Sequence, residues 1–264
     1  MRPGPPPPRP PPVGHGLEPY KAGLPYTYAF GHFTALEALK HRPADVRAVL
    51  VHGALEPHWR RELERSAERA GVPCERDDAG VARLRRHDQV RCLAVVSKAL
   101  DAVLPERDHA VLVAAGQAGN VGSALRSLAA FGIDDVVMVA PKVDAWSPHV
   151  LRASVGMRFA MRCQALARPA DYLAAHPNHR VYSFSASGDA ELGSVEFRSP
   201  FALWFGPEWP GAGAPDEPPP GLSVRIASRP LVESLNLAVA VSLAAYAAGR
   251  GKGRTNDAYE AAWE

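Results

Sequence analysis

Apolar and polar positions follow one another along this chain in blocks that predict strands alternating with helices. Short apolar runs are typical of strands, and stretches with apolar residues three or four positions apart are typical of helices. In the first part of the chain we predict strands at residues 46–51, 72–75 and 92–96 and helices at 33–39, 58–70 and 81–86. Order is expected to begin near Tyr26, and these elements predict a small α/β domain.

The pattern changes after a connector at residues 99–108. The runs at 110–114 and 136–140 are continuously apolar, as expected of parallel strands buried on both faces. We predict further strands at 159–163, 181–184, 201–205 and 223–227, and helices at 120–131, 148–156, 171–175 and 234–248. Alternating strands and helices predict an α/β fold with a doubly wound, mostly parallel sheet. The expected domains are residues 26–98 and 109–249.

The two ends of the chain have a different composition. Residues 1–25 are mostly proline, glycine and polar residues, which favour polyproline II and cannot bury a core. We expect a disordered tail there, with a ligand for a proline-binding domain as the alternative. The last residues, 250–264, begin with a basic glycine-rich stretch and are expected to be mobile.

The formal charge is only +2, but it is unevenly distributed. Residues 1–98 carry 16 lysines and arginines against 11 acidic residues, and residues 99–264 carry 14 against 17. This asymmetry indicates a polyanion-binding module beside a small-molecule site. A solvated surface is the alternative for the arginines concerned. They are Arg60, Arg61, Arg65, Arg83, Arg85, Arg86 and Arg91.

Several classes of protein are disfavoured. No apolar run is long enough to span a bilayer, and no secretory signal begins the chain, so we expect no membrane and a cytoplasmic protein. Cys74, Cys92 and Cys163 are expected to be free thiols. The ten histidines form no HxxxH or HxH pair, so no metal site is expected. Without GxGxxG or Walker motifs, dinucleotide oxidoreductases and P-loop enzymes have little support.

Three polar clusters fall at predicted strand ends. They contain Asn120, Gly122 and Arg126; Gly206, Pro207 and Glu208; and Ser234 with Asn236. Ligands of open α/β sheets bind outside the carboxyl ends of strands, so the three clusters are expected to converge. Each has a plainer interpretation as a turn, and Ser234 or Asn236 could simply cap the last helix.

The order and spacing of these clusters resemble the three motifs of the SpoU/TrmH family of RNA ribose 2′-O-methyltransferases, in the SPOUT superfamily. The first motif corresponds to Asn120–Arg126 followed by Ala130, Phe131 and Gly132. The second corresponds to residues 206–208, continuing at 221–223, and the third to 226–236. Residues 30–39 are similar to the start of an L30e-like substrate-binding domain. The chain departs from the family at Gln117–Ala118, at Pro207, at an insertion over 210–220 and at Ala227–Ser228.

The resemblance implies a deep trefoil knot in the C-terminal domain, a pocket for S-adenosyl-L-methionine within it, and a homodimer formed partly through the last helix. It implies catalytic roles for Arg126, Asn120, Glu208, Ser234 and Asn236. It also implies cofactor contacts from Leu203, Gly206, Ile226 and Leu235. For the same apolar residues, the plain alternative is that they form core.

The implied reaction is methyl transfer to a ribose 2′-hydroxyl in structured RNA, with rRNA favoured over tRNA. A catalytically degenerate SPOUT protein that binds RNA or cofactor is the main alternative. An unrelated α/β nucleotide-binding enzyme is the other.

Overall fold

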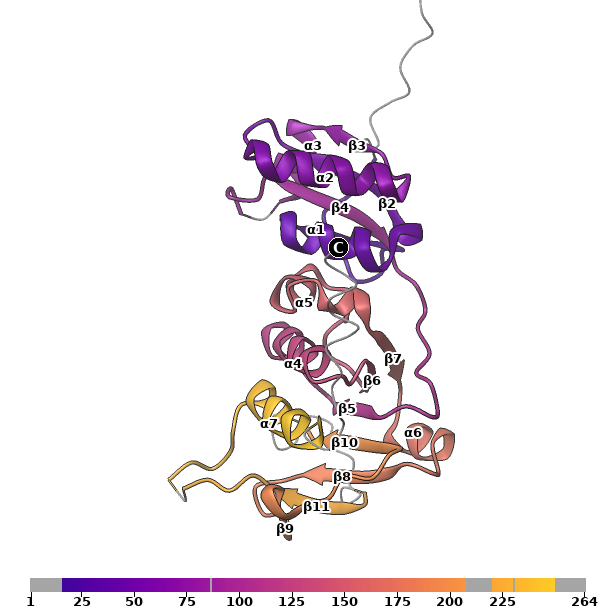
Figure 1. Cartoon of the computed structure of the whole chain (residues 1–264), viewed down its shortest axis with the longest axis vertical. Coiled ribbons are helices and arrows are strands. Elements are labelled where there is room, and N and C mark those ends of the chain that lie inside the picture. Colours follow the sequence, from indigo (N-terminus) through magenta and orange to yellow (C-terminus); the bar gives the residue numbers. More distant parts are fainter. Residues whose placement is uncertain (1–15, 86, 208–219, 230, 250–264) are drawn as a thin grey trace, which may run out of the picture. The chain divides into compact units, whose positions relative to one another are not determined.

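The computed structural model describes residues 16–85, 87–207, 220–229 and 231–249, shown as ribbon in Figure 1. The chain forms two compact units. The first unit contains residues 1–99 and 146–160, and the second contains residues 100–145 and 161–264. Each unit is described by itself below.

The first unit is built on a four-stranded mixed sheet. Its strand order is β1 (Tyr26–Phe30), β4 (Cys92–Ser97), β2 (Val46–Val51) and β3 (Cys74–Arg76). Strands β1 and β2 run antiparallel to β4, and β3 runs parallel to β2. The helices of this unit are α1 (His32–His41), α2 (Pro57–Ala70), α3 (Asp78–Leu84) and α5 (Pro148–Ala153), with 3-10 turns η1 (Pro43–Asp45) and η2 (Met157–Ala160).

Alternate residues of these strands supply two cores. Val49, Ala94 and Val96 join one cluster, whereas Leu50 and Leu93 join another on the opposite face. This is the period of two expected of a pleated strand. The predicted small α/β domain is therefore present, and predicted strand 46–51 coincides with β2.

Residues 16–25 are ordered, in contrast to the tail predicted for residues 1–25. Leu17, Tyr20 and Leu24 pack against the second of these cores, and Lys98 Nζ donates a hydrogen bond to the carbonyl of Ala22 at 2.6 Å. The composition suggested disorder, but three large apolar side chains are enough to anchor the segment. Residues 1–15 and the predicted tail at 250–264 lie outside the described residues.

Residues 146–160 belong to the first unit, although they fall inside the range predicted for the second domain. Trp146, Leu151 and Phe159 are buried in the core of the first unit. The fully buried Arg158 lies with its guanidinium carbon 4.0 Å from the Trp146 ring centroid. The strand predicted at 159–163 is wrong in its bounds, because Phe159 lies in η2 and the strand begins only at Arg162.

The second unit contains a seven-stranded sheet in which all paired strands are parallel. The strand order is β7 (Arg162–Leu166), β6 (Asp135–Val139), β5 (His109–Val113), β10 (Phe201–Phe205), β8 (Arg180–Phe184), β11 (Leu222–Arg225) and β9 (Ala190–Glu191). Its helices are α4 (Ala118–Ala130), α6 (Pro169–Ala175) and α7 (Leu237–Gly249), with one 3-10 turn η3 (Leu192–Ser194). The predicted parallel α/β fold is confirmed.

Strands β5, β6 and β10 are buried along their whole length, as expected of a sheet covered on both faces. Tyr172 of α6 packs with Val111 and Trp204 in one core. Helix α7 packs along α4, where Ser242 Oγ donates to Ser127 Oγ at 2.7 Å. Close approach of the loop before β11 to β8 requires Gly221, since its φ is +76° and a Cβ would lie 2.1 Å from the Val181 carbonyl oxygen.

Two of the helix starts that differ from the prediction bear on the polar clusters. Helix α4 begins at Ala118, so Asn120 lies inside its first turn rather than at its start. Helix α7 begins at Leu237, so Ser234 and Asn236 precede it. Both shifts leave the polar residues beside the carboxyl ends of the strands. The trefoil knot stays a prediction.

Candidate active site

A cavity of about 500 Å³ opens at the carboxyl ends of β8, β10 and β11 in the second unit. We call it the strand-end cavity. It is lined by Gln117, Asn120, Phe184, Ser185, Ala186, Phe205, Gly206, Pro207, Val224, Ile226, Ser228, Glu233, Ser234, Leu235, Asn236, Leu237 and Ala240. This is the edge of a parallel sheet at which ligands of open α/β folds bind.

One wall of the strand-end cavity is aromatic. Phe184 ends β8 and Phe205 ends β10, and the two residues are partners in the register of these neighbouring strands. Their rings stack with centroids 4.8 Å apart and planes 11° apart. Such a surface is suited to the flat, apolar part of a ligand.

A second wall is polar and joins two segments that are distant in sequence. Asn236 Nδ2 donates to Asn120 Oδ1 at 2.9 Å, and Asn236 Oδ1 accepts from the backbone N–H of Ala238 at 2.9 Å. The second bond satisfies a free N–H at the start of α7, as helix-capping asparagines do. Asn236 thus caps α7 and also lines the cavity, so the two interpretations of this residue are compatible.

Glycine and one acidic residue shape the rest of the cavity. No heavy atom outside the neighbouring residues lies within 4 Å of a Cβ built on Gly206, so the space above it is open. Glu233 supplies the carboxylate among the described lining residues. A carboxylate at the wall favours a ligand that carries positive charge.

The structure brings together six of the nine predicted site residues. They are Asn120, Gly206, Ile226, Ser234, Leu235 and Asn236. Leu203 is fully buried inside β10 and does not line the cavity, so its predicted cofactor contact is not supported. Arg126 is exposed on α4 and is absent from the cavity lining. Glu208 lies outside the described residues.

Sequence reasoning missed other lining residues. Phe184 and Phe205 end strands that were correctly predicted, but an apolar residue at a strand end looks the same as core. Glu233 and Gln117 adjoin predicted motifs and could have been included on position alone.

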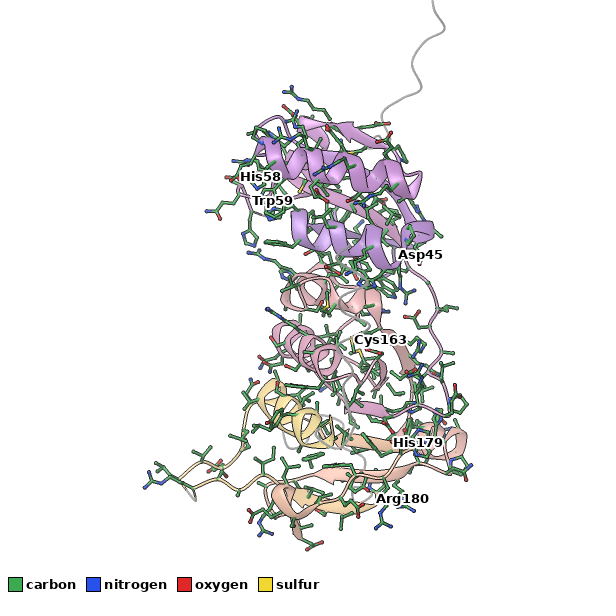
Figure 2. The ribbon with its side chains drawn as sticks, in the orientation of Figure 1. Asp45, His58, Trp59, Cys163, His179 and Arg180 are labelled. Atoms are coloured by element: carbon green, nitrogen blue, oxygen red, sulfur yellow. The ribbon has the colours of Figure 1, made fainter. Side chains whose placement is uncertain are left out.

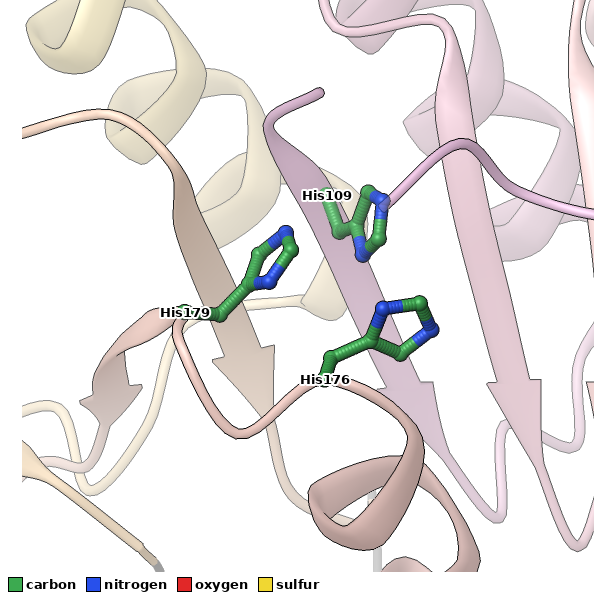
Figure 3. Close-up of side chains that lie close together, drawn as sticks. All are labelled: His109, His176 and His179. Carbon is green, nitrogen blue, oxygen red and sulfur yellow. The ribbon is translucent and has the colours of Figure 1, made fainter. Parts of the chain in front are cut away.

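His109 meets two histidines from a distant part of the sequence elsewhere in the second unit (Figure 3). His109, His176 and His179 each offer a nitrogen, and these atoms lie within 4.8 Å of one another. We call them the histidine cluster. Burial lowers the pKa of His109 to about 4 and also lowers the pKa of His176. The histidines form no HxxxH or HxH pair in the sequence, but three of them lie close together in the folded chain. Their spacing along the chain did not reveal this contact.

The arginines of the first unit are largely engaged within the protein. Arg60 Nη2 donates to the carbonyl of Gly53 at 2.9 Å, Arg65 pairs with Glu62, and Arg85 pairs with Asp88. Arg86 lies outside the described residues. The solvated-surface interpretation therefore accounts for part of this set.

An aromatic group is exposed on the first unit. His32 stacks on Trp59 with ring centroids 3.9 Å apart, and Phe33 meets Trp59 edge-on. Trp59 and its neighbour His58 come from the first turn of α2 (Figure 2). The Phe33 side chain is 55% exposed, which is unusual for a large apolar residue.

Fold and cavity together define a doubly wound α/β domain with a ligand site at the carboxyl edge of its parallel sheet. Sequence comparison gives the family. The profile of the SpoU rRNA Methylase family matches residues 109–246, a range that includes every residue lining the strand-end cavity. The chain belongs to this family.

A relative from Synechocystis, described as an uncharacterized tRNA/rRNA methyltransferase, is 34% identical over 134 residues. The match covers 50% of this chain, and the chain spans about half, 49%, of that relative.

Solved structures show the same fold. The SpoU methyltransferase AviRb from Streptomyces viridochromogenes has a TM-score of 0.70 at 23% identity, covering 86% of this chain and 90% of that one. An rRNA methyltransferase from Sinorhizobium meliloti has a TM-score of 0.70 at 18% identity, covering 87% and 89%. Both proteins have also been solved with AdoMet bound.

Within the part of the chain that the structure describes, no helix combines the length and apolar character needed to cross a membrane.

Proposed function

We propose that this protein transfers the methyl group of S-adenosyl-L-methionine to a ribose 2′-hydroxyl in structured RNA, with rRNA favoured over tRNA. The observation that carries the proposal is the strand-end cavity, which joins Asn120 of the first motif to Asn236 of the third by a hydrogen bond. The cavity lies wholly within the range matched by the SpoU rRNA Methylase family.

The cavity suits the proposed cofactor. Its volume of about 500 Å³ falls within the roughly 300–1,000 Å³ common for small-molecule sites. The stacked Phe184 and Phe205 rings and Ile226 offer apolar surface to an adenine, and Asn236 and Ser234 offer polar groups to a ribose or an amino-acid moiety. Glu233 offers a negative charge to a sulfonium or ammonium group. AdoMet complexes of two proteins with this fold support the same assignment.

When bound, the cofactor supplies an electrophilic methyl group that a hydroxyl oxygen can attack as its proton is lost. The protein therefore has to hold the ribose in line and accept or pass on that proton. Asn120 and Asn236 fix each other by their hydrogen bond, so their remaining polar atoms present a set direction to a bound ribose. Ser234 and Glu208 complete the predicted polar set, the latter outside the described residues.

Arg126 is assigned to the RNA rather than to the cofactor. Its guanidinium stays protonated at any working pH, so it is a poor general base. An exposed arginine on α4 can bind a phosphate or stabilise the alkoxide that develops on the ribose.

The first unit, proposed as the L30e-like domain, would hold the RNA. Its exposed Phe33, beside the stacked His32 and Trp59, offers a face for an unpaired base, and its exposed arginine side chains, such as Arg61, offer charge to phosphates. A homodimer through the second unit and a cytoplasmic location belong to the same proposal.

The test is methyl transfer from labelled S-adenosyl-L-methionine to unmodified total RNA. We expect label in an alkali-resistant 2′-O-methyl dinucleotide, and we expect Arg126→Ala to lose it. Arg180→Ala is a matched control, because Arg180 is also exposed in the second unit but begins β8, away from the strand-end cavity. Unimpaired turnover by Arg126→Ala would contradict the role given to Arg126.

A binding protein without activity is the second candidate. Pro207 lines the cavity at a position where the family usually has asparagine, and proline lacks an N–H and a side-chain amide. Cofactor binding without transfer to any RNA pool would favour this candidate over the enzyme.

A further inference from the structure

The histidine cluster lies at the amino ends of strands in the second unit, at the edge of the sheet opposite the strand-end cavity. His109 begins β5, His176 directly follows α6, and His179 directly precedes β8. Figure 3 shows the three rings facing one another from these segments. The three residues have exposed fractions of 0% for His109, 9% for His176 and 8% for His179.

Backbone carbonyls set the tautomers of two of these rings. His109 Nε2 lies 2.8 Å from the carbonyl oxygen of Leu104, and His179 Nε2 lies 2.9 Å from that of Arg107. A carbonyl oxygen only accepts, so each Nε2 carries the proton. In the neutral rings Nδ1 is then left with a lone pair. The same second contact, ring N–H to backbone carbonyl, orients histidines that bind metals.

The third ring has an unmet polar atom. His176 Nδ1 is buried without a hydrogen-bond partner among the described residues. Its ring centroid lies 4.7 Å from that of His109 and 5.2 Å from that of His179. A buried nitrogen with no partner costs free energy unless a ligand satisfies it.

We propose that His109, His176 and His179 bind one divalent transition-metal ion of the Zn²⁺ type. Neutral imidazoles suit such ions, and three histidines with one further position form a known type of zinc site. Calcium and magnesium are disfavoured, because they require oxygen ligands.

The geometry is close to that required. Zinc–nitrogen bonds of about 2.0–2.1 Å place the ligand atoms of a tetrahedral site roughly 3.3 Å apart. The three nitrogens already lie within 4.8 Å of one another, so each pair has to close by at most roughly 1.5 Å on binding.

One existing contact competes with the ion. The Tyr172 hydroxyl lies 3.0 Å from His109 Nδ1 and donates to it in the tautomer given above. Burial raises the pKa of Tyr172, so the hydroxyl stays a protonated donor. Metal binding replaces this single neutral hydrogen bond by coordination of three nitrogens.

The ion would fasten the start of β5 to the turn between α6 and β8. These segments are not neighbours in the sheet, since β10 lies between β5 and β8. The site lies apart from the strand-end cavity, and the proposal does not rest on the proposed methyl transfer.

The experiment uses the full chain without a polyhistidine tag, stripped on a chelating resin and then equilibrated with Zn²⁺ and desalted. We expect about one equivalent of zinc by plasma mass spectrometry and a rise in Tm on zinc addition. Co²⁺ in place of zinc is expected to give visible d–d bands without thiolate charge transfer, which excludes Cys74, Cys92 and Cys163 as ligands.

His176→Gln is the informative variant, because in the metal-free protein Nδ1 of His176 makes no hydrogen bond that its loss would break. It should lower zinc affinity by more than about 100-fold, beyond the 10- to 100-fold typical of an outer-shell change. His87→Gln, at an exposed position in the first unit, should bind as the wild type does.

The Tyr172→Phe variant distinguishes a metal-binding site from a cluster that is held together only by hydrogen bonds. It removes the competing hydroxyl, so zinc binding should be retained or tightened. Three results would overturn the proposal: a folded wild type that takes up no zinc, retention of zinc by His176→Gln, or loss of zinc from Tyr172→Phe.

Discussion

A single residue of this site contributes both to the fold and to the wall of the strand-end cavity. Asn236 ends the loop that lines the strand-end cavity, donates to Asn120 through Nδ2 and caps α7 through Oδ1. Its two side-chain atoms thus have separable roles. This explains why a helix-capping residue type stands at the cavity wall.

Asn236→Ala and Asn236→Asp should differ in stability. Alanine removes the cap and should lower the free energy of unfolding by about 1 kcal/mol. Aspartate keeps the oxygen that accepts from Ala238 N–H, so its stability should stay within about 0.5 kcal/mol of the wild type. Urea unfolding measures both. Equal losses in the two variants would show that the Asn120 contact, which both lose, dominates the stability.

Gly206→Leu should fill the cavity without disturbing the fold. A Cβ at Gly206 meets nothing within 4 Å, and its φ is not in the left-handed region. The side chain therefore occupies ligand space, and S-adenosyl-L-methionine affinity should fall by about 10- to 100-fold. Calorimetric titration measures the affinity, and thermal unfolding should give an unchanged Tm.

Gly193→Leu is the control for that change. Gly193 has equally open surroundings in the same unit but does not line the cavity, so its replacement should leave affinity unchanged. If both leucine variants bind the cofactor like the wild type, the cofactor does not occupy this cavity.

The site could be predicted in part because polar residues after buried strands have a recognisable pattern. Asn120, Ser234 and Asn236 were chosen in this way, and all three line the cavity. Leu203 does not line it, because alternate residues of a central strand differ only in the face they occupy, and Leu203 is fully buried. The histidine cluster could not be predicted, since His109 meets His176 and His179 only through the arrangement of strands that are distant in sequence.

Whole elements were predicted more reliably than their ends. Strands buried on both faces, such as β5 and β10, are nearly continuous apolar runs, and their positions agree to within a residue. Strand β7 was predicted too early in the chain, because Phe159 and Met161 are apolar but do not belong to the strand. Phe159 fills the core of the first unit, and both residues are buried.

An ion pair links the starts of β6 and β7. Arg162 donates to Asp135 through Nε at 2.7 Å and through Nη2 at 2.5 Å, and Asp135 also accepts from the N–H of Leu104 at 2.9 Å. Burial alone would raise the pKa of Asp135, but the bonds from Arg162 and Leu104 outweigh it and lower that pKa. Pairing therefore favours the charged form of this carboxylate in spite of its burial.

Arg162→Met should destabilise the protein strongly for that reason. Asp135 is 1% exposed, so removing its partner leaves a buried charge and should cost about 3 kcal/mol. Arg198→Met breaks an ion pair with Glu196 in which both side chains are more than half exposed, and it should lower the stability far less. Chemical unfolding of both variants checks the difference. Similar losses would contradict the argument from burial.

The aromatic side chains His32, Phe33 and Trp59 of the first unit lead to a separate prediction about RNA binding. Phe33→Ala should weaken binding of structured RNA by about 1–3 kcal/mol, the range for loss of a base-stacking ring. Phe33→Tyr keeps the ring and should bind normally. Because Phe33 is 55% exposed, neither change should lower Tm much. Filter binding at fixed salt measures the affinity, and wild-type affinity in Phe33→Ala would remove Phe33 from the proposed surface.

At the scale of the whole molecule, the chain does not divide at a single point. It leaves the first unit after residue 99, returns to it over residues 146–160 and then completes the second. The returning segment brings Trp146, Leu151 and Phe159 into the core of the first unit. A cut at residue 99 would therefore strip that core of three large side chains, so the boundary predicted between 98 and 109 does not separate two independent pieces.

Helix α7 is apolar on two faces, although a helix at the surface of a monomer needs only one. Val241, Ala244 and Ala248 are buried, whereas Val239, Leu243 and Tyr246 are 47%, 41% and 53% exposed. The exposed three are spaced by four and three residues, so they form one stripe along the helix. An exposed apolar stripe of this kind is typical of a protein–protein interface and supports the proposed homodimer.

Leu243→Arg should therefore convert a dimer to a monomer, because it places a charge at the centre of the stripe, where a buried unpaired cation is costly. Sedimentation velocity over a range of concentrations measures the assembly state. Leu222→Arg is the matched control, since Leu222 is 45% exposed on β11 of the same unit but lies off this stripe, and it should remain dimeric. A monomeric wild type, or a Leu243→Arg variant that still dimerises, would mean that α7 is not the interface. Since Leu243 does not line the strand-end cavity, cofactor binding by the monomeric variant would also show whether one chain suffices for the site.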